Sequence, residues 1–171
     1  MRGNFDIAIG GENLIDTVHR LLPSGEVAQN HNLGGSPYNV AVALARQGMK
    51  PHYLTPISTD GFGEKLADHL QREGVVLAGE RRSEPTTQAI VTLENGIPTY
   101  AFHRDGTAER AISRPGIDAA MPDFATHFHA GSLAFAGGGD ADIWEAVFHK
   151  ARQNGLTTSL DPNVRPSLID D

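Results

Sequence analysis

The feature that most constrains the fold is a glycine pair, Gly34-Gly35, placed directly before the start of a helix. Ser36 suits the N-cap and Pro37 suits the first helical position, because proline has no backbone N–H to leave unpaired there. The apolar residues that follow share one helical face before Gly48: Val40, Ala41, Leu44 and Ala45. The pattern predicts a helix that starts beside exposed backbone N–H groups, where a ligand could bind.

Strands and helices alternate along most of the chain. Runs of strand length occur at residues 5–10, 52–57, 75–77, 126–132 and 156–160. Further helices are predicted after Asp60, ending at Gly74, and after Asp140, which we expect to act as a cap. This order predicts an α/β fold with a parallel sheet, whose ligands bind beyond the carboxyl ends of the strands. The residues at such ends are Gly10-Gly11, Ser132 and Asp161.

Two hairpins are predicted within this alternation, near residues 12–33 and 86–104. The first is interrupted by Pro23-Ser24-Gly25, and the second contains the turn Asn95-Gly96 between stretches rich in β-forming residues. With 171 residues the chain is long enough for one compact core and too short for two full-sized domains. We therefore expect one domain over residues 1–171, with both hairpins inserted into its core.

Composition excludes several classes of protein. The net charge of −7 argues against general binding to nucleic acid or anionic membranes, which requires clustered Lys and Arg. The absence of cysteine excludes disulfides and thiolate metal sites. No apolar run approaches the roughly 20 residues that span a bilayer, and the N-terminus does not resemble a signal peptide. We expect a cytoplasmic protein.

Two histidines, His127 and His129, alternate along a predicted strand and so point to one face of the sheet. Such a pair could bind a metal ion, but no third ligand lies in evident register. The sequence therefore favours structural histidines at these positions.

One long segment, residues 34–48, resembles the N-terminal signature of the ribokinase and fructokinase (PfkB-type) family of carbohydrate kinases. Residues 11–16, Gly-Glu-Asn-Leu-Ile-Asp, are similar to the first-strand motif of fructokinases. Residues 60–66 and the Asp-Pro-Asn-Val-Arg-Pro stretch at 161–166 match further family segments in the same order. The resemblance therefore runs through the whole chain.

The resemblance implies a three-layer α/β/α ribokinase-like (Rossmann-like) fold with a small β-sheet lid, truncated before the nucleotide-binding half. It implies that Asp16, Gly34, Gly35 and Asn39 bind the sugar. The two hairpins correspond to the lid, which closes over the sugar in this family and often forms the contact of a homodimer. A closed lid would exclude water, which could otherwise accept the phosphoryl group.

Other site residues have two interpretations. Residues 103–108 resemble the lid segment that reaches the sugar in fructokinases and 2-keto-3-deoxygluconate kinases, so Arg104 could pair with a substrate carboxylate or remain a solvated surface residue. Arg165 is placed to meet a substrate or phosphate charge. Asn163 could contact the nucleotide, although Asp161 and Asn163 also suit a turn at the end of a strand.

The family keeps its catalytic base in a Gly-x-Gly-Asp motif with an Asp-Thr-x-Gly-Ala context far downstream, and no motif with that context occurs here. Gly137-Gly138-Gly139-Asp140 has the letters but lies in the wrong place and lacks the context. No catalytic residue is therefore assigned, and the base is expected beyond Asp171. ATP and Mg²⁺ are expected to need the missing half, and this chain alone is expected to be inactive.

The resemblance predicts phosphoryl transfer from ATP to a sugar hydroxyl, and fructose is the substrate that we consider first. The alternatives are a 2-keto-3-deoxygluconate kinase and a non-catalytic module for sugar binding or dimerisation. A nicotinamide oxidoreductase is disfavoured because its glycine motif is absent.

Overall fold

The computed structural model describes residues 6–21, 24, 27–94 and 97–164. Its centre is a five-stranded parallel sheet with the order β11-β10-β1-β4-β6. The strands are β1 (Ile7–Gly10), β4 (His52–Tyr53), β6 (Val76–Leu77), β10 (His127–Gly131) and β11 (Thr157–Asp161). Strands distant in sequence are neighbours here, so that Ile7 of β1 lies opposite His127 of β10.

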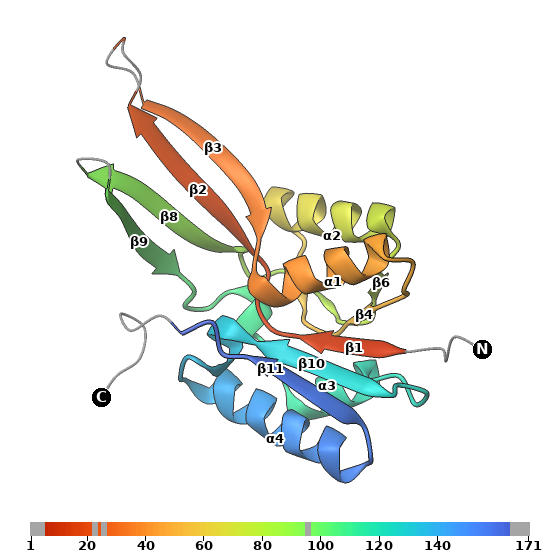
Figure 1. Cartoon of the computed structure of the whole chain (residues 1–171). Helices are drawn as coiled ribbons and strands as arrows, with labels where there is room; N and C mark the ends of the chain where they lie inside the picture. Colours follow the sequence, from red (N-terminus) through yellow and green to blue (C-terminus); the bar gives the residue numbers. More distant parts are fainter. Residues whose placement is uncertain (1–5, 22–23, 25–26, 95–96, 165–171) are drawn as a thin grey trace.

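Helices cover both faces of this sheet (Figure 1). One core cluster joins Ile9 of β1 to α1 (Ser36–Arg46) and α2 (Gly61–Glu73). The other joins Ala8 to α3 (Arg114–Ala120) and α4 (Gly139–Gln153). Successive residues of a strand point to opposite faces, which is why neighbours in β1 belong to different clusters. The expected three-layer α/β/α arrangement is confirmed.

The helix ends follow local chemistry. Asp60 caps α2 by accepting hydrogen bonds from the amides of Phe62 and Gly63, and Gly74 ends it in the left-handed region at φ 93°. The predicted start of α1 is wrong by one residue, because Gly35 is the N-cap at φ 114° and Ser36 is already helical. Asp140 likewise lies inside α4 and does not cap it, since its carboxylate binds Arg110.

The strand expected over residues 52–57 is two short strands. β4 ends at Tyr53, and β5 (Ile57–Ser58) pairs instead with β7 (Arg81–Arg82). Pro56 lies between them and has no N–H to donate to a continuous ladder. Phe5, the first residue of the strand expected over 5–10, lies outside the described residues.

The two hairpins form a second sheet of four strands with the order β3-β2-β8-β9. Its strands are β2 (Leu14–Leu21), β3 (Val27–Gly34), β8 (Thr87–Glu94) and β9 (Ile97–His103). Each hairpin is antiparallel, whereas β2 and β8 pair in parallel. The sheet projects from the core beside the start of α1 (Figure 1).

The remaining elements are two short 3₁₀ helices, η1 (Ala108–Arg110) and η2 (Ser132–Phe135). η2 continues directly from β10, and η1 follows the second hairpin. None of the helices in the described part of the chain has the length and apolar character needed to cross a membrane.

Candidate functional site

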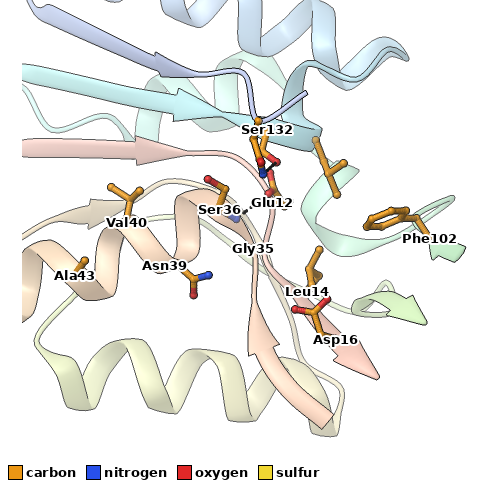
Figure 2. Close-up of a pocket in the computed structure, with 12 residues that line it drawn as sticks. Glu12, Leu14, Asp16, Gly35, Ser36, Asn39, Val40, Ala43, Phe102 and Ser132 are labelled. Carbon is orange, nitrogen blue, oxygen red and sulfur yellow. Dashed lines mark hydrogen bonds between the residues drawn. The ribbon is translucent and has the colours of Figure 1, made fainter. Parts of the chain in front are cut away.

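A cavity of about 700 Å³ lies where the carboxyl ends of the central strands meet the base of the four-stranded sheet and the start of α1 (Figure 2). Its polar lining comes from five elements or their ends. The lining residues are Glu12, Leu14, Asp16, Gly35, Ser36, Asn39, Val40, Ala43, Phe102, Ser132, Leu133 and Asn163. Strand ends of this kind are where open parallel sheets bind ligands.

The glycine pair allows the backbone to pass close to the cavity. A Cβ atom on Gly34 would lie 2.6 Å from Oδ2 of Asp16. A Cβ atom on Gly35 would lie 2.4 Å from the carbonyl oxygen of Glu12, and its φ of 114° disfavours any side chain. Backbone therefore excludes a side chain at Gly35, whereas a side chain at Gly34 would have to displace the carboxyl of Asp16.

Asp16 and Asn39 bring complementary polar groups to the cavity. Asp16 lies on β2 and is half-buried, and this loss of solvent raises the pKa of its carboxyl. Asn39 lies in the first turn of α1, where its backbone N–H donates to the carbonyl of Gly35 and its side chain remains available. The two side chains point into the same space in Figure 2. Together they offer acceptors and a donor to a ligand that carries hydroxyl groups.

Hydrogen bonds join the strand ends beneath these residues. The Ser36 amide donates to Oε1 of Glu12 at 2.9 Å, and the Ser36 hydroxyl donates to Asp161 at 3.1 Å. Nδ2 of Asn163 donates to the Ser132 hydroxyl at 3.0 Å. The ends of β1, β10 and β11 are thus tied to one another and to α1. Asn163, predicted as a nucleotide contact, lines the same cavity as Asp16 and Asn39.

Arg104 does not line the cavity. It is 9% exposed, its Nε donates to Glu109 at 3.0 Å, and its guanidinium lies 3.6 Å from Asp140. Arg110 binds the same Asp140 at 2.7 Å. Arg104 is therefore not the solvated surface residue that the sequence allowed, and its contact with a substrate stays a prediction. Arg165 lies outside the described residues.

The two histidines of β10 have hydroxyl partners on β11. His127 contacts Thr157 at 2.7 Å and Ser159 at 2.8 Å, and His129 contacts Ser159 at 2.8 Å. Burial lowers the pKa of both imidazoles. Among the described residues no group of three or more His, Cys, Asp or Glu side chains could hold a metal ion.

The sequence model of the pfkB family carbohydrate kinases matches residues 14–171. The chain belongs to this family. It is 36% identical over 162 residues to a fructokinase of Rhizobium leguminosarum bv. trifolii, a match that covers 94% of this chain and 49% of the relative. It is 28% identical over 144 residues to the 2-dehydro-3-deoxygluconokinase of Bacillus subtilis (strain 168), covering 81% of this chain and 44% of that enzyme.

Solved structures of the family show the same fold. The fructokinase of Xylella fastidiosa superposes with a TM-score of 0.88 at 31% identity, covering 98% of this chain and 55% of that one. A second structure of that fructokinase, with bound ATP, gives a TM-score of 0.85. This pfkB-family chain spans about half the length of the relatives it matches.

Sequence reasoning missed two polar residues of the cavity, Glu12 and Ser132, as site residues. Glu12 belongs to the same motif as Asp16, and Ser132 lies at a predicted strand end, so the sequence contains a signal for each of them. Nothing in the linear sequence brings them together, since 120 residues separate them. Their proximity follows from the parallel pairing of β1 with β10.

Proposed function

We propose that this chain carries the sugar-binding part of an ATP-dependent carbohydrate kinase. Fructose is the substrate that we propose first. The observation that carries the proposal is the convergence of Asp16 and Asn39 on one cavity beside the Gly34-Gly35 backbone. A carboxylate can accept hydrogen bonds from two neighbouring hydroxyls, and a side-chain amide can both donate and accept. Leu14 and Phe102 add apolar surface for the C–H faces of a sugar ring.

The four-stranded sheet suits the role of a lid. Its strands supply Leu14, Asp16 and Phe102 to the cavity, so any movement of the sheet would open or close the site. Closure would remove water, which competes with the sugar for the phosphoryl group. We further propose that the same sheet supports a homodimer, and that the protein acts in the cytoplasm.

Phosphoryl transfer also needs a base for the attacking hydroxyl and charge stabilisation at the phosphates. We assign neither to this chain. Asp140 is bound to Arg110 and buried, which agrees with leaving it out of catalysis. No set of metal ligands converges among the described residues, so we derive no step through Mg²⁺. We expect the chain of 171 residues to bind sugar without phosphorylating it.

The alternative substrate is 2-keto-3-deoxygluconate. The similarity to the Bacillus deoxygluconokinase supports it, as does the position of Arg104 at the end of the four-stranded sheet. For that substrate Arg104 would have to exchange Glu109 and Asp140 for the ligand's carboxylate. Fructose has no carboxylate and requires no such exchange.

Calorimetric titration tests these proposals. Fructose, 2-keto-3-deoxygluconate and ATP are titrated separately into the chain and into the Asp16→Asn variant. Saturable binding of fructose that is weakened in the variant supports the proposed function. Preference for the keto-acid identifies the alternative, and the absence of saturable binding of either sugar at two temperatures contradicts both. Turnover of sugar and ATP by the pure chain would refute the expectation that it is inactive alone.

A further inference from the structure

Glu12 is a buried carboxyl at the floor of the cavity. It is 2% exposed and immediately follows the Gly10-Gly11 end of β1. Its Oε1 accepts the backbone N–H of Ser36 at 2.9 Å, the first amide of α1. Because Pro37 has no N–H, the next backbone N–H of the helix is that of Tyr38. Glu12 therefore fixes where α1 begins relative to the strand ends.

The second oxygen of Glu12 is not satisfied in the same way. Oε2 is buried and has no hydrogen-bond partner within the described part of the chain. The Ser132 hydroxyl lies next to the carboxyl without meeting hydrogen-bond geometry (Figure 2). Ser132 has a φ of 60°, a conformation that costs energy for a residue with a side chain. A strained serine thus holds its hydroxyl between Glu12 and the Asn163 amide.

The titratable groups around Glu12 do not neutralise a negative charge there. They are Asp16 of β2 across the cavity, Tyr53 of β4, Glu109 of η1, and Asp161 of β11 through Ser36. Arg104 is engaged by Glu109, whose own charge disfavours ionisation of Glu12. The Ser36 amide at the positive end of α1, the backbone N–H of Glu12 itself and the Ser132 hydroxyl favour the ionised form. Burial outweighs them and raises the pKa of Glu12 to about 7.

We propose that Glu12 is a positioning residue of the sugar site, which holds the start of α1 and takes up a proton when a neutral polyol fills the cavity. The inference rests on the proposed function. A bound sugar replaces water above the carboxyl and so disfavours its charge further. The neutral carboxyl keeps its acceptor for Ser36 and gains an O–H that can donate to Ser132. Proton uptake then completes a continuous series of hydrogen bonds from the Ser36 amide through Glu12 to the Ser132 hydroxyl.

Calorimetry in two buffers of different ionisation enthalpy measures this uptake directly. If sugar raises the pKa of Glu12 by one unit, about 0.4 proton is taken up per fructose bound at pH 7. Under the same linkage the affinity for fructose is about fivefold weaker at pH 8 than at pH 6. Uptake near zero in the wild-type chain would overturn the inference while leaving the sugar site intact.

Two variants locate the proton. Glu12→Gln keeps a carbonyl for Ser36 and presents N–H₂ to Ser132, so it copies the neutral acid. It should bind fructose without proton uptake, and at pH 8 as tightly as the wild type does at pH 6. Glu145→Gln, an exposed site on α4, is the matched control and should keep the wild-type uptake. Undiminished uptake in Glu12→Gln would assign the proton elsewhere, Asp16 included, and refute the inference.

A third variant tests the contact with Ser132 even if Glu12→Gln fails to fold. Ser132→Gly removes the hydroxyl, and glycine accepts the φ of 60° without strain. In the ligand-free chain this hydroxyl lowers the pKa of Glu12, and in the proposed sugar complex it accepts the O–H of the neutral acid. Its removal should therefore narrow the difference between the two pKa values and reduce both the proton uptake and the pH dependence of fructose affinity. Uptake and pH dependence equal to those of the wild type would contradict the proposal. Absence of fructose binding in every protein, wild type included, would refute the proposed function and this inference with it.

Discussion

The cavity and the ionic cluster at the base of the four-stranded sheet surround their buried charges with different groups. The ionic cluster consists of Arg104, Glu109, Arg110 and Asp140. Within it each acid lies within 3.6 Å of an arginine. In the cavity, Glu12 and Asp16 face backbone amides, hydroxyls or open space. Burial raises the pKa of both, as it does that of Glu109, but Glu109 has an arginine beside it that lowers its pKa and the cavity acids do not.

This difference in pairing indicates which region holds the fold together and which could bind a ligand. Charges that lie beside opposite charges hold elements together and leave little for a ligand, as Arg110 does by joining η1 to α4. Nη2 of Arg104 and Oδ2 of Asp140 form no hydrogen bond with the residues that the structure describes, but they lie 3.6 Å from each other. Groups with unused hydrogen-bonding capacity cost free energy in the empty protein, and a ligand can recover that cost. The cavity is therefore the better candidate for binding, although the ionic cluster contains more formal charge.

The largest expected effect is on the ionic cluster. Asp140→Ala leaves Arg110 without its buried partner and Arg104 with one acid fewer. Removal of one side of a buried ion pair costs about 3–5 kcal/mol, because the remaining charge stays desolvated. Urea denaturation followed by circular dichroism measures this loss. Asp105→Asn is the matched control, since Asp105 pairs with the same Arg110 but is fully exposed and should change stability by less than about 0.5 kcal/mol. Equal losses would show that burial does not distinguish these pairs.

The next effect is on the cavity and depends on pH. The pKa of Glu12 is about 7 in the folded chain and 4.5 for a solvated glutamate, so the folded state keeps a proton that the unfolded state has lost. The stability that Glu12 contributes is complete below pH 4.5 and is lost as the pH rises through 7. Over that interval the loss is about 3 kcal/mol.

Glu12→Gln should remove this loss. The variant should be more stable than the wild type at pH 8 and similar to it at pH 4.5, as judged by urea denaturation at both values. Taking the difference between the two proteins cancels the contributions of other titrating groups. A wild type that is the more stable protein at pH 8 would mean that the start of α1 fully offsets the cost of the charge on Glu12.

Much of the fold could be predicted from the sequence because its signals are local. Asp60 and Gly74 mark the ends of α2 by chemistry that acts within a few residues. The predicted start of α1 is one residue late, since Gly35 at φ 114° replaces Ser36 as the cap. Pro56 divides a run of strand-forming residues that periodicity alone indicates as continuous.

The site was less predictable because it depends on distant pairing. Resemblance to the family indicated Asp16, Gly35 and Asn39, which the structure brings to one cavity. For Arg104 the local sequence could not show the contact with Asp140, which lies on a different element. Glu12 and Ser132 meet only because β1 and β10 are adjacent in the sheet.

A third prediction concerns ligand affinity. Asp16→Asn replaces a charged acceptor by a neutral amide of the same size. Loss of a hydrogen bond to a charged group costs about 1.5–3 kcal/mol, so fructose should bind about 10- to 100-fold more weakly. Calorimetry measures the affinity, and thermal denaturation should show little change in stability. Asp68→Asn, an exposed position on α2, is the control and should leave both values unchanged. Unaltered fructose affinity in Asp16→Asn would remove Asp16 from the site.

The smallest predicted effect concerns the connection between the two regions. Asp60 caps α2 and also accepts from the amide and hydroxyl of Thr86, at 2.8 and 2.6 Å, directly before β8. Thr87 in turn donates to Glu109 of the ionic cluster.

Asp60→Ala should cost about 1–2 kcal/mol of stability as a lost cap, whereas Asp60→Asn, also a good cap, should cost less. Fructose affinity should change by less than about threefold, because Asp60 does not line the cavity and the cost falls on stability. A larger loss of affinity in Asp60→Ala than in Asp16→Asn would mean that the attachment of the sheet, and not the polar groups of the cavity, determines sugar binding.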